Sequence, residues 1–93
     1  MRIISKAAIT EFAKTHKDAL ESLSHWYSVT KRAVWRHLVD VRADFPYADR
    51  VDVFTVFNIG GNKYRLIARV DFDERALYVE RVLTHEQYDR ENQ

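Results

Sequence analysis

Three basic residues, Lys63, Arg65 and Arg69, lie two and four positions apart in the second half of the chain. Alternate side chains of a β-strand point to one face, so this spacing predicts a row of cations on a sheet. Such a row suits phosphate binding, and the guanidinium of Arg65 can grip two phosphate oxygens at once. Arg65 is therefore the candidate for stabilising charge on a reacting phosphate. The alternative is a solvated sheet face balanced by Asp71.

A second pair of candidates, His85 and Tyr88, lies three residues apart near the C-terminus. Thr84 to Gln87 has the S/T-x-x-E/Q form of a capping box, which predicts a short helix starting near His85 with both candidates on one side. A helix N-terminus attracts anions and disfavours a protonated histidine, which suits a proton carrier beside a phosphate. The alternative is that Tyr88 only anchors this helix and His85 is an ordinary polar residue.

Several other kinds of site have no pattern in the sequence. The 93 residues include no cysteine, which excludes disulfides, thiol nucleophiles and cysteine zinc sites. Ser-His-Asp, Walker-loop and His-x-x-x-His patterns are absent, so we expect no metal and no cofactor. The net charge of +1 requires any nucleic-acid site to be a local cluster of cations. Without a long apolar run or a secretory leader, we expect a cytoplasmic protein with no membrane partner.

The first part of the chain predicts two helices that would pack against the sheet carrying the candidate residues. Arg2-Ile3-Ile4 is a short β-like opening. Apolar residues at spacings of three and four then predict helices over Lys6–Thr15 and Ala19–Arg32. Ser5 is placed to cap the first helix, and Asp18 begins a capping-box pattern for the second. The two helices should form a hairpin with one shared apolar face.

The second half changes to the period of strands. Val34–Asp52 predicts a connector, because Pro46 stops a helix there, with at most one helical turn at Val39–Asp44. The pair Gly60-Gly61 supplies positive φ for a hairpin turn. Three strands are predicted: Val53–Ile59, Asn62–Phe72 and Ala76–Leu83. The expected class is α+β in a single domain over residues 1–93, with an antiparallel sheet of about four strands, two N-terminal helices on one face and a short C-terminal helix.

Two blocks of the sequence resemble those that mark HigB-type toxins of the RelE superfamily. The first block is Phe57–Ile67, with the sequence FNIGGNKYRLI, and the second is Thr84–Asp89, with the sequence THEQYD. Trp35 and Asp44-Phe45-Pro46 fit the segment before them. The similarity extends from Met1 to Asp89 and so covers essentially the whole chain.

One departure from the family pattern concerns the strand before Thr84. Many members read Tyr-Ile-Arg there, whereas this chain has Tyr78-Val79-Glu80 with Arg81 one position later. A shift of one residue changes the face on which a strand residue lies, which leaves the role of Arg81 open. Glu80 would lower the local positive potential.

The resemblance implies a RelE-like fold with a concave sheet face open to RNA. It also implies an endoribonuclease that cleaves mRNA without a metal, usually on translating ribosomes, and so inhibits translation and growth. The implied partner is an antitoxin of the HigA type with a helix-turn-helix domain, through which alone the complex would bind operator DNA. The alternative is a non-catalytic RNA- or ribosome-binding module of the same fold, which near-neutral charge and Glu80 favour.

Metal-free RNA cleavage requires a base for the 2′-hydroxyl, a cation for the phosphate and an acid for the departing 5′-oxygen. With the family resemblance, the expected catalytic residues are Arg65, His85, Tyr88 and Lys63. The residues expected to bind RNA around them are Asn62, Arg69 and Arg81.

Overall fold

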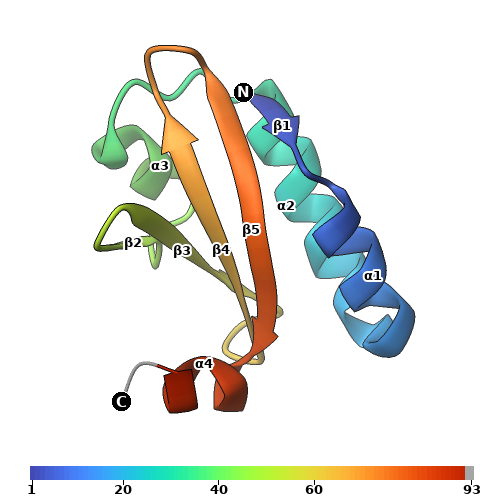
Figure 1. Cartoon of the computed structure of the whole chain (residues 1–93). Coiled ribbons are helices and arrows are strands. Elements are labelled where there is room, and N and C mark those ends of the chain that lie inside the picture. Colours follow the sequence, from blue (N-terminus) through green and yellow to red (C-terminus); the bar gives the residue numbers. More distant parts are fainter. Residues whose placement is uncertain (92–93) are drawn as a thin grey trace.

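The computed structural model describes residues 1–91 and confirms the α+β class (Figure 1). None of the helices in this range is both long and apolar enough to cross a membrane. The predicted helices and strands are found within about two residues of their expected bounds. In chain order the elements are β1 (Arg2–Ile4), α1 (Ala7–Thr15), a 3₁₀ turn η1 (Lys17–Ala19), α2 (Leu20–Arg32), α3 (Leu38–Asp44), β2 (Asp49–Val51), β3 (Phe54–Ile59), β4 (Tyr64–Asp71), β5 (Ala76–Thr84) and α4 (His85–Glu91).

The sheet has five strands in the order β1-β5-β4-β3-β2, one more than expected. The additional strand, β2, lies in the segment predicted as a connector and pairs with β3. The sheet is also mixed, because β1 runs parallel to β5 with Arg2 opposite Ala76. A parallel pair needs a long crossover, and here the whole of the chain from α1 to β4 lies between the two partners. The strands β2 to β5 are antiparallel, as predicted.

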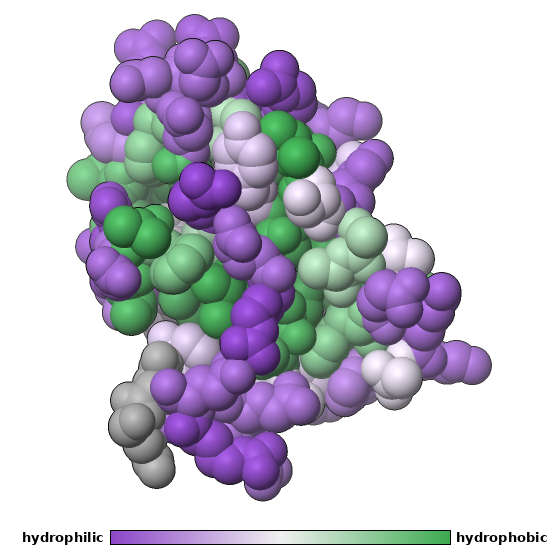
Figure 2. Space-filling view, viewed as in Figure 1, coloured by the Kyte–Doolittle hydropathy of each residue, from purple (hydrophilic) through white to green (hydrophobic). Residues whose placement is uncertain are grey.

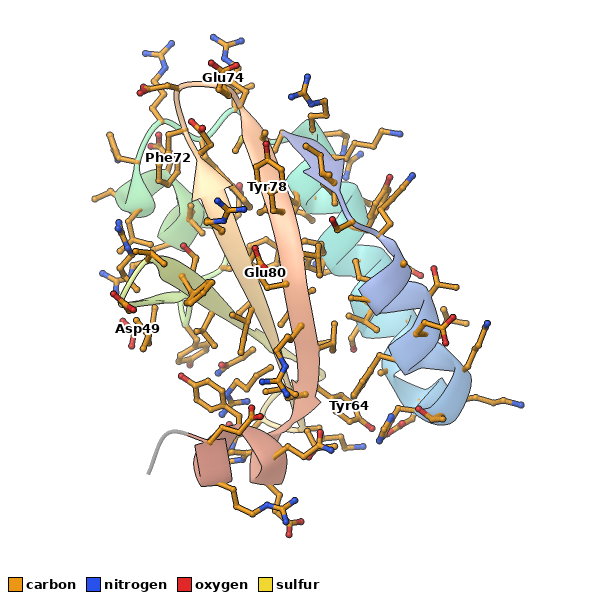
Figure 3. All side chains as sticks on the ribbon, in the orientation of Figure 1. Asp49, Tyr64, Phe72, Glu74, Tyr78 and Glu80 are labelled. Carbon is orange, nitrogen blue, oxygen red and sulfur yellow. The ribbon has the colours of Figure 1, made fainter. Side chains whose placement is uncertain are left out.

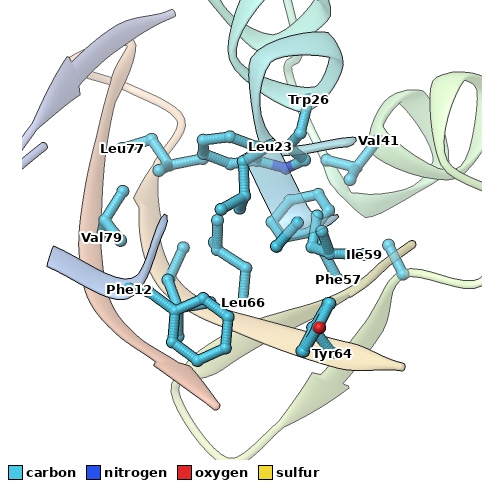
Figure 4. Packing of buried hydrophobic residues seen from close by; sticks show 14 of the residues in the cluster. Phe12, Leu23, Trp26, Val41, Phe57, Ile59, Tyr64, Leu66, Leu77 and Val79 are labelled. Carbon is cyan, nitrogen blue, oxygen red and sulfur yellow. The ribbon is translucent and has the colours of Figure 1, made fainter. Parts of the chain in front are cut away.

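The helices α1 and α2 cover one face of the sheet, which confirms the shared apolar face predicted for them (Figure 1). Trp26 of α2 meets Phe57 of β3 edge to face, with ring centroids 5.4 Å apart. Phe12 of α1, Leu23 of α2 and Leu66 of β4 belong to the same buried cluster (Figure 4). Burial of these large apolar side chains, at about 25 cal/mol per Å² of apolar surface, is the main force that fixes the helices on the sheet.

Side chains of β4 alternate between this core and the opposite side of the sheet, which we call the open face. Tyr64, Leu66 and Ala68 are buried on the helix side. By the period of two, Arg65 and Arg69 point to the open face. Figure 2 shows this side of the molecule, where a band of hydrophilic residues crosses the middle of the face with hydrophobic surface on either side.

A β-bulge in β5 determines the orientation of Arg81. The β4–β5 register shifts by one residue between Ile67 and Ala68, and this leaves Glu80 without a partner on β4. The extra residue shifts the alternation, so Glu80 and Arg81 are both exposed on the open face. The buried side chains on the two sides of the bulge are Leu77, Val79 and Val82. Arg81 therefore lies on the open face in spite of the shift of one residue, which is where a residue that binds RNA would have to lie.

Two predicted helix caps are also wrong. Ser5 has φ of 69° and precedes Lys6, which is the first flanking residue of α1 and makes no side-chain capping bond. Ala19 is the corresponding residue of α2. Asp18 instead accepts a hydrogen bond of 2.6 Å from the hydroxyl of Tyr64, which is far away in sequence. The Asp18 carboxylate, which the local pattern assigned to a helix cap, therefore accepts a long-range hydrogen bond instead.

Candidate active site

Arg65 lies at the start of β4, immediately after the turn that joins it to β3. Gly60 and Gly61 both have positive φ, +64° and +69°, as the sequence predicted. The Nη2 atom of Arg65 donates to Oδ1 of Asn62 at 2.6 Å, and Nη1 donates to the backbone carbonyls of Asn62 and Tyr64 at 3.3 and 3.1 Å. The residue is only 9 % exposed. The turn therefore holds the guanidinium in one orientation.

The charge of Arg65 has no carboxylate partner within residues 1–91. Three of its five N–H groups are used by the turn, which leaves two donors for another acceptor. A guanidinium this deeply buried without an anion is costly, so the site is suited to receiving one. The other cations of the prediction are each paired: Lys63 with Asp18 at 3.5 Å, Arg69 with Glu80 at 3.4 Å and Arg81 with Glu91 at 2.8 Å.

Tyr88 is brought to Arg65 by the last helix. The centroid of its ring lies 5.9 Å from Cζ of Arg65. The predicted capping box forms, with Thr84 N–H donating to Oε1 of Gln87 and Gln87 N–H donating to Oγ1 of Thr84. The backbone N–H of His85 also donates to the carbonyl of residue 63 at 2.8 Å. These bonds fix the start of α4 against the β3–β4 turn and hence place Tyr88 beside Arg65.

His85 shares the helix of Tyr88 and is held by a neighbour that the sequence prediction missed. Its Nε2 lies 3.0 Å from Oδ2 of Asp89, one turn further along α4. The spacing of four residues on a helix was the available signal for this pair. If Nε2 carries the proton that Asp89 accepts, Nδ1 remains free to accept a proton from a substrate.

Lys63 does not share a face with Arg65, which corrects the predicted row of cations. The strand begins at Tyr64, so alternation does not extend back to Lys63 in the turn. Its Nζ lies 3.5 Å from Asp18, on the side of the sheet covered by helices. The hydrogen bond from Tyr64 lowers the pKa of Asp18, and the same bond raises the pKa of Tyr64. Lys63 thus belongs to a cluster that ties the turn to η1.

A cavity of about 320 Å³ lies on the open face next to Tyr88. Its apolar part comes from Phe54, Val56 and Ile67. Arg81 also lines the cavity, because the bulge brings it to this face. The remaining lining residues are Val51, Glu80, Tyr88 and Glu91. The predicted RNA-binding residue Arg81 and the predicted catalytic residue Tyr88 therefore share one cavity, which has apolar surface for a base and charged groups at its edge.

Arg69 lies further along β4 than this cavity. Its Cζ is 4.9 Å from the ring centroid of Tyr78, and its Nε is 3.4 Å from Glu80. Both of these β5 residues are labelled in Figure 3. Within residues 1–91, no three His, Asp or Glu side chains are grouped closely enough to hold a metal ion. The structure thus assembles Asn62, Arg65 and Tyr88, adds Arg81 through a shared cavity, and leaves Lys63 and Arg69 apart.

Comparison with known proteins identifies the family. Residues 19–91, which include Arg65 and all of α4, match the family described as HigB toxin, the RelE-like toxic component of a toxin–antitoxin system. The chain belongs to this family. Membership confirms the resemblance on which the sequence prediction relied, and it means that the chain is the toxic component of a pair whose other member is an antitoxin.

Curated relatives in this family are similar over nearly their whole length. The mRNA interferase toxin HigB of Escherichia coli K12 is 28 % identical over 92 residues, covering 96 % of this chain and 88 % of the relative. The mRNA interferase HigB of E. coli O6:H1, strain CFT073, is 30 % identical over 93 residues, covering 97 % and 90 %. The mRNA interferase HigB of Shigella flexneri is 28 % identical over 92 residues.

Proposed function

We propose that this toxin is a metal-independent endoribonuclease that cleaves mRNA on the translating ribosome. The observation that supports this most strongly is Arg65, a nearly buried guanidinium with two free donors and no carboxylate partner within residues 1–91. The curated relatives are named mRNA interferases, which supports RNA as the substrate. A reacting phosphate in contact with Arg65 would supply the missing anion.

The reaction needs two proton transfers and one stabilised charge. The 2′-oxygen loses its proton and attacks phosphorus, the bond from phosphorus to the 5′-oxygen breaks, and the 5′-oxygen takes a proton. The products are a 2′,3′-cyclic phosphate and a free 5′-hydroxyl. Arg65 binds the phosphate oxygens, on which negative charge increases, and such a donor is worth about 10²–10³ in rate. Tyr88 and His85 carry the protons, each worth about 10²–10⁴ at most.

Three further predicted residues act around this point. Asn62 acts on the reaction by holding the guanidinium of Arg65 through its Oδ1. Arg81 binds a flanking phosphate at the cavity after it separates from Glu91, since a surface ion pair is worth only about 0–1 kcal/mol. Lys63, with its side chain 68 % exposed, binds a more distant phosphate by the same exchange with Asp18.

The antitoxin of this pair is proposed to be a HigA-type protein with a helix-turn-helix domain, and operator DNA would be bound only through it. Because an active toxin destroys the mRNA that a host needs, good yield should require co-expression with the antitoxin. Strong expression of the isolated toxin without growth arrest would contradict the proposal.

The direct test adds the purified toxin to a translation reaction and maps the 5′ ends of the mRNA. New 5′ ends inside codons are expected, and they should be absent with Arg65→Ala. A parallel reaction on naked mRNA in EDTA tests metal independence, and a comparison of the two tests ribosome dependence. Inhibited translation without new 5′ ends would favour the alternative, a non-catalytic ribosome-binding module. That alternative rests on Glu80, which lowers the positive potential at the cavity.

A further inference from the structure

A second cavity, of about 570 Å³, lies at the end of the sheet opposite α4. It adjoins the β4–β5 turn, which Figure 1 shows at the far end of the sheet from α4. Its volume is within the range of about 300–1,000 Å³ typical of small-ligand sites. Unlike the cavity beside Tyr88, it is lined by two cations, Arg36 and Arg69, together with the aromatic rings of Phe72 and Tyr78.

Arg69 and Tyr78 form a cation–π pair at this cavity. The guanidinium carbon lies over the ring, 4.9 Å from its centroid, in a cation–π contact. Its partner Glu80 is 3.4 Å away, and both side chains of this ion pair are partly exposed, which makes the pair weak. RNA bases stack on arginine planes as well as on aromatic rings. The Arg69 guanidinium and the Tyr78 ring, which both line the cavity, are therefore planar groups on which a base can stack.

The other charged groups at the cavity favour a base over a phosphate as the group bound inside it. Asp71 and Asp73 line it, so their carboxylates disfavour a phosphate inside, whereas their oxygens can accept hydrogen bonds from the amino groups of a base. Arg36 is exposed, and within residues 1–91 its guanidinium makes no hydrogen bond or ion pair. It is available for the phosphate of a nucleotide whose base lies in the cavity.

We propose that this cavity binds one nucleotide of the RNA away from the point of cleavage, with its base stacked on Arg69 and its phosphate held by Arg36. The proposal rests on the proposed function, since it takes RNA to be the substrate. Arg65 and Arg69 are four residues apart on β4, or about 13 Å at roughly 3.3 Å per residue. A stacked strand that rises about 3.4 Å per nucleotide would cover this distance in about four nucleotides.

The test measures binding of a fluorescein-labelled, eight-nucleotide 2′-O-methyl RNA of mixed sequence by anisotropy. This probe has no free 2′-hydroxyl, so it binds without being cleaved. Arg69→Lys keeps the charge but loses the plane, and we expect it to weaken binding about 5-fold or more, the lower limit for loss of one stacked base. Arg36→Gln should also weaken binding and reduce its salt dependence. Arg42→Gln, which removes an arginine outside both cavities, should bind as the wild type does.

A second readout places 2-aminopurine at each position of the probe in turn. One position should change its emission on binding wild-type toxin and not on binding Arg69→Lys. Full affinity of Arg69→Lys, no position that responds in this way, or no binding of the probe by the wild type would each overturn the nucleotide site. Cleavage of mRNA by the wild-type toxin is scored separately, so loss of the site and loss of the proposed function are distinguishable. Since Arg69 and Arg36 are exposed, both variants should fold.

Discussion

Substitution of Arg65 by alanine should separate activity from stability more sharply than any other change in this toxin. The other candidate arginines, Arg69 and Arg81, are exposed and form surface ion pairs. Arg65 is 9 % exposed and is oriented by three hydrogen bonds within its own turn. Its two remaining donors have no partner within residues 1–91, so they are the ones that the reaction would use.

The expected loss of activity follows from those two donors. Removing one preorganised donor that stabilises charge in a transition state costs about 10²–10³ in rate, or roughly 2.7–4 kcal/mol. Arg65→Ala removes two donors and the positive charge together. The rate of mRNA cleavage should therefore fall by about 10²-fold or more.

The expected change in stability is small because two effects oppose each other. Three hydrogen bonds are lost, at about 0.5–1.5 kcal/mol net for each. Removing the guanidinium also relieves the burial of a charge without an anion, which costs up to several kcal/mol. The difference should be about 1 kcal/mol or less in either direction, and this corresponds to a change in Tm below about 8 °C for a domain of this size.

The assay compares cleavage of mRNA in a translation reaction with thermal unfolding of the same preparations. Arg42→Ala is the matched control, because Arg42 donates to the carbonyl of Ala48 at 2.9 Å and pairs with Asp49 at 3.3 Å, away from α4. The control should cleave normally. If Arg65→Ala cleaves within about tenfold of the wild type, or if its activity falls only because it unfolds, the guanidinium does not stabilise the reacting phosphate.

Four further predictions concern the neighbouring groups and the RNA surface. Tyr88→Phe keeps the ring beside Arg65 but removes the hydroxyl, so single-turnover cleavage should fall about 10- to 10³-fold with Tm unchanged. His85→Ala should lower the same rate by a similar factor, and normal cleavage by both variants would make α4 only an anchor. The Tyr64 hydroxyl lowers the pKa of Asp18 below 3.8, so the stability from this bond is present above that value and lost as the pH falls through the lowered one. The Tm of Tyr64→Phe should accordingly fall less steeply than that of the wild type between about pH 5 and pH 2. Binding of single-stranded RNA should show a log–log salt slope of about −3, for roughly four phosphate contacts at about 0.7 each, and a slope near zero would refute the assignment of these cations.

Local patterns in the sequence were sufficient to predict most elements of the fold. The helices expected over Lys6–Thr15 and Ala19–Arg32 are found as α1 and α2, because the spacing of apolar residues reflects the period of a helix itself. The capping box at Thr84–Gln87 forms both of its bonds, since its two partners lie within one turn. Gly60 and Gly61 have the positive φ expected of a turn. Each of these features depends on residues a few positions apart.

Family resemblance and residue type together also selected Arg65 and Tyr88, but the sequence had no means of showing that they touch. Their contact depends on where α4 begins relative to the β3–β4 turn, and a backbone bond from His85 to residue 63 determines that. The same limit applies to the pairing of β1 with β5, whose partners are separated by most of the chain. Non-local pairing leaves no periodic trace in either segment.

Tertiary structure decided the orientation of the charged side chains. The carboxylate of Asp18 could have capped α2 or accepted a hydrogen bond from Tyr64. It accepts from the distant Tyr64 hydroxyl because folding brings the two groups within 2.6 Å. Lys63 lies on the helix side, where it contacts Asp18, and not on the open face with Arg65. Arg81 reaches the open face because the bulge adds Glu80 to β5 without a partner on β4, and such a shift depends on how the two strands pair. Sequence therefore determined which charged and aromatic groups the toxin has, whereas competition among distant partners determined which of them lie on the open face.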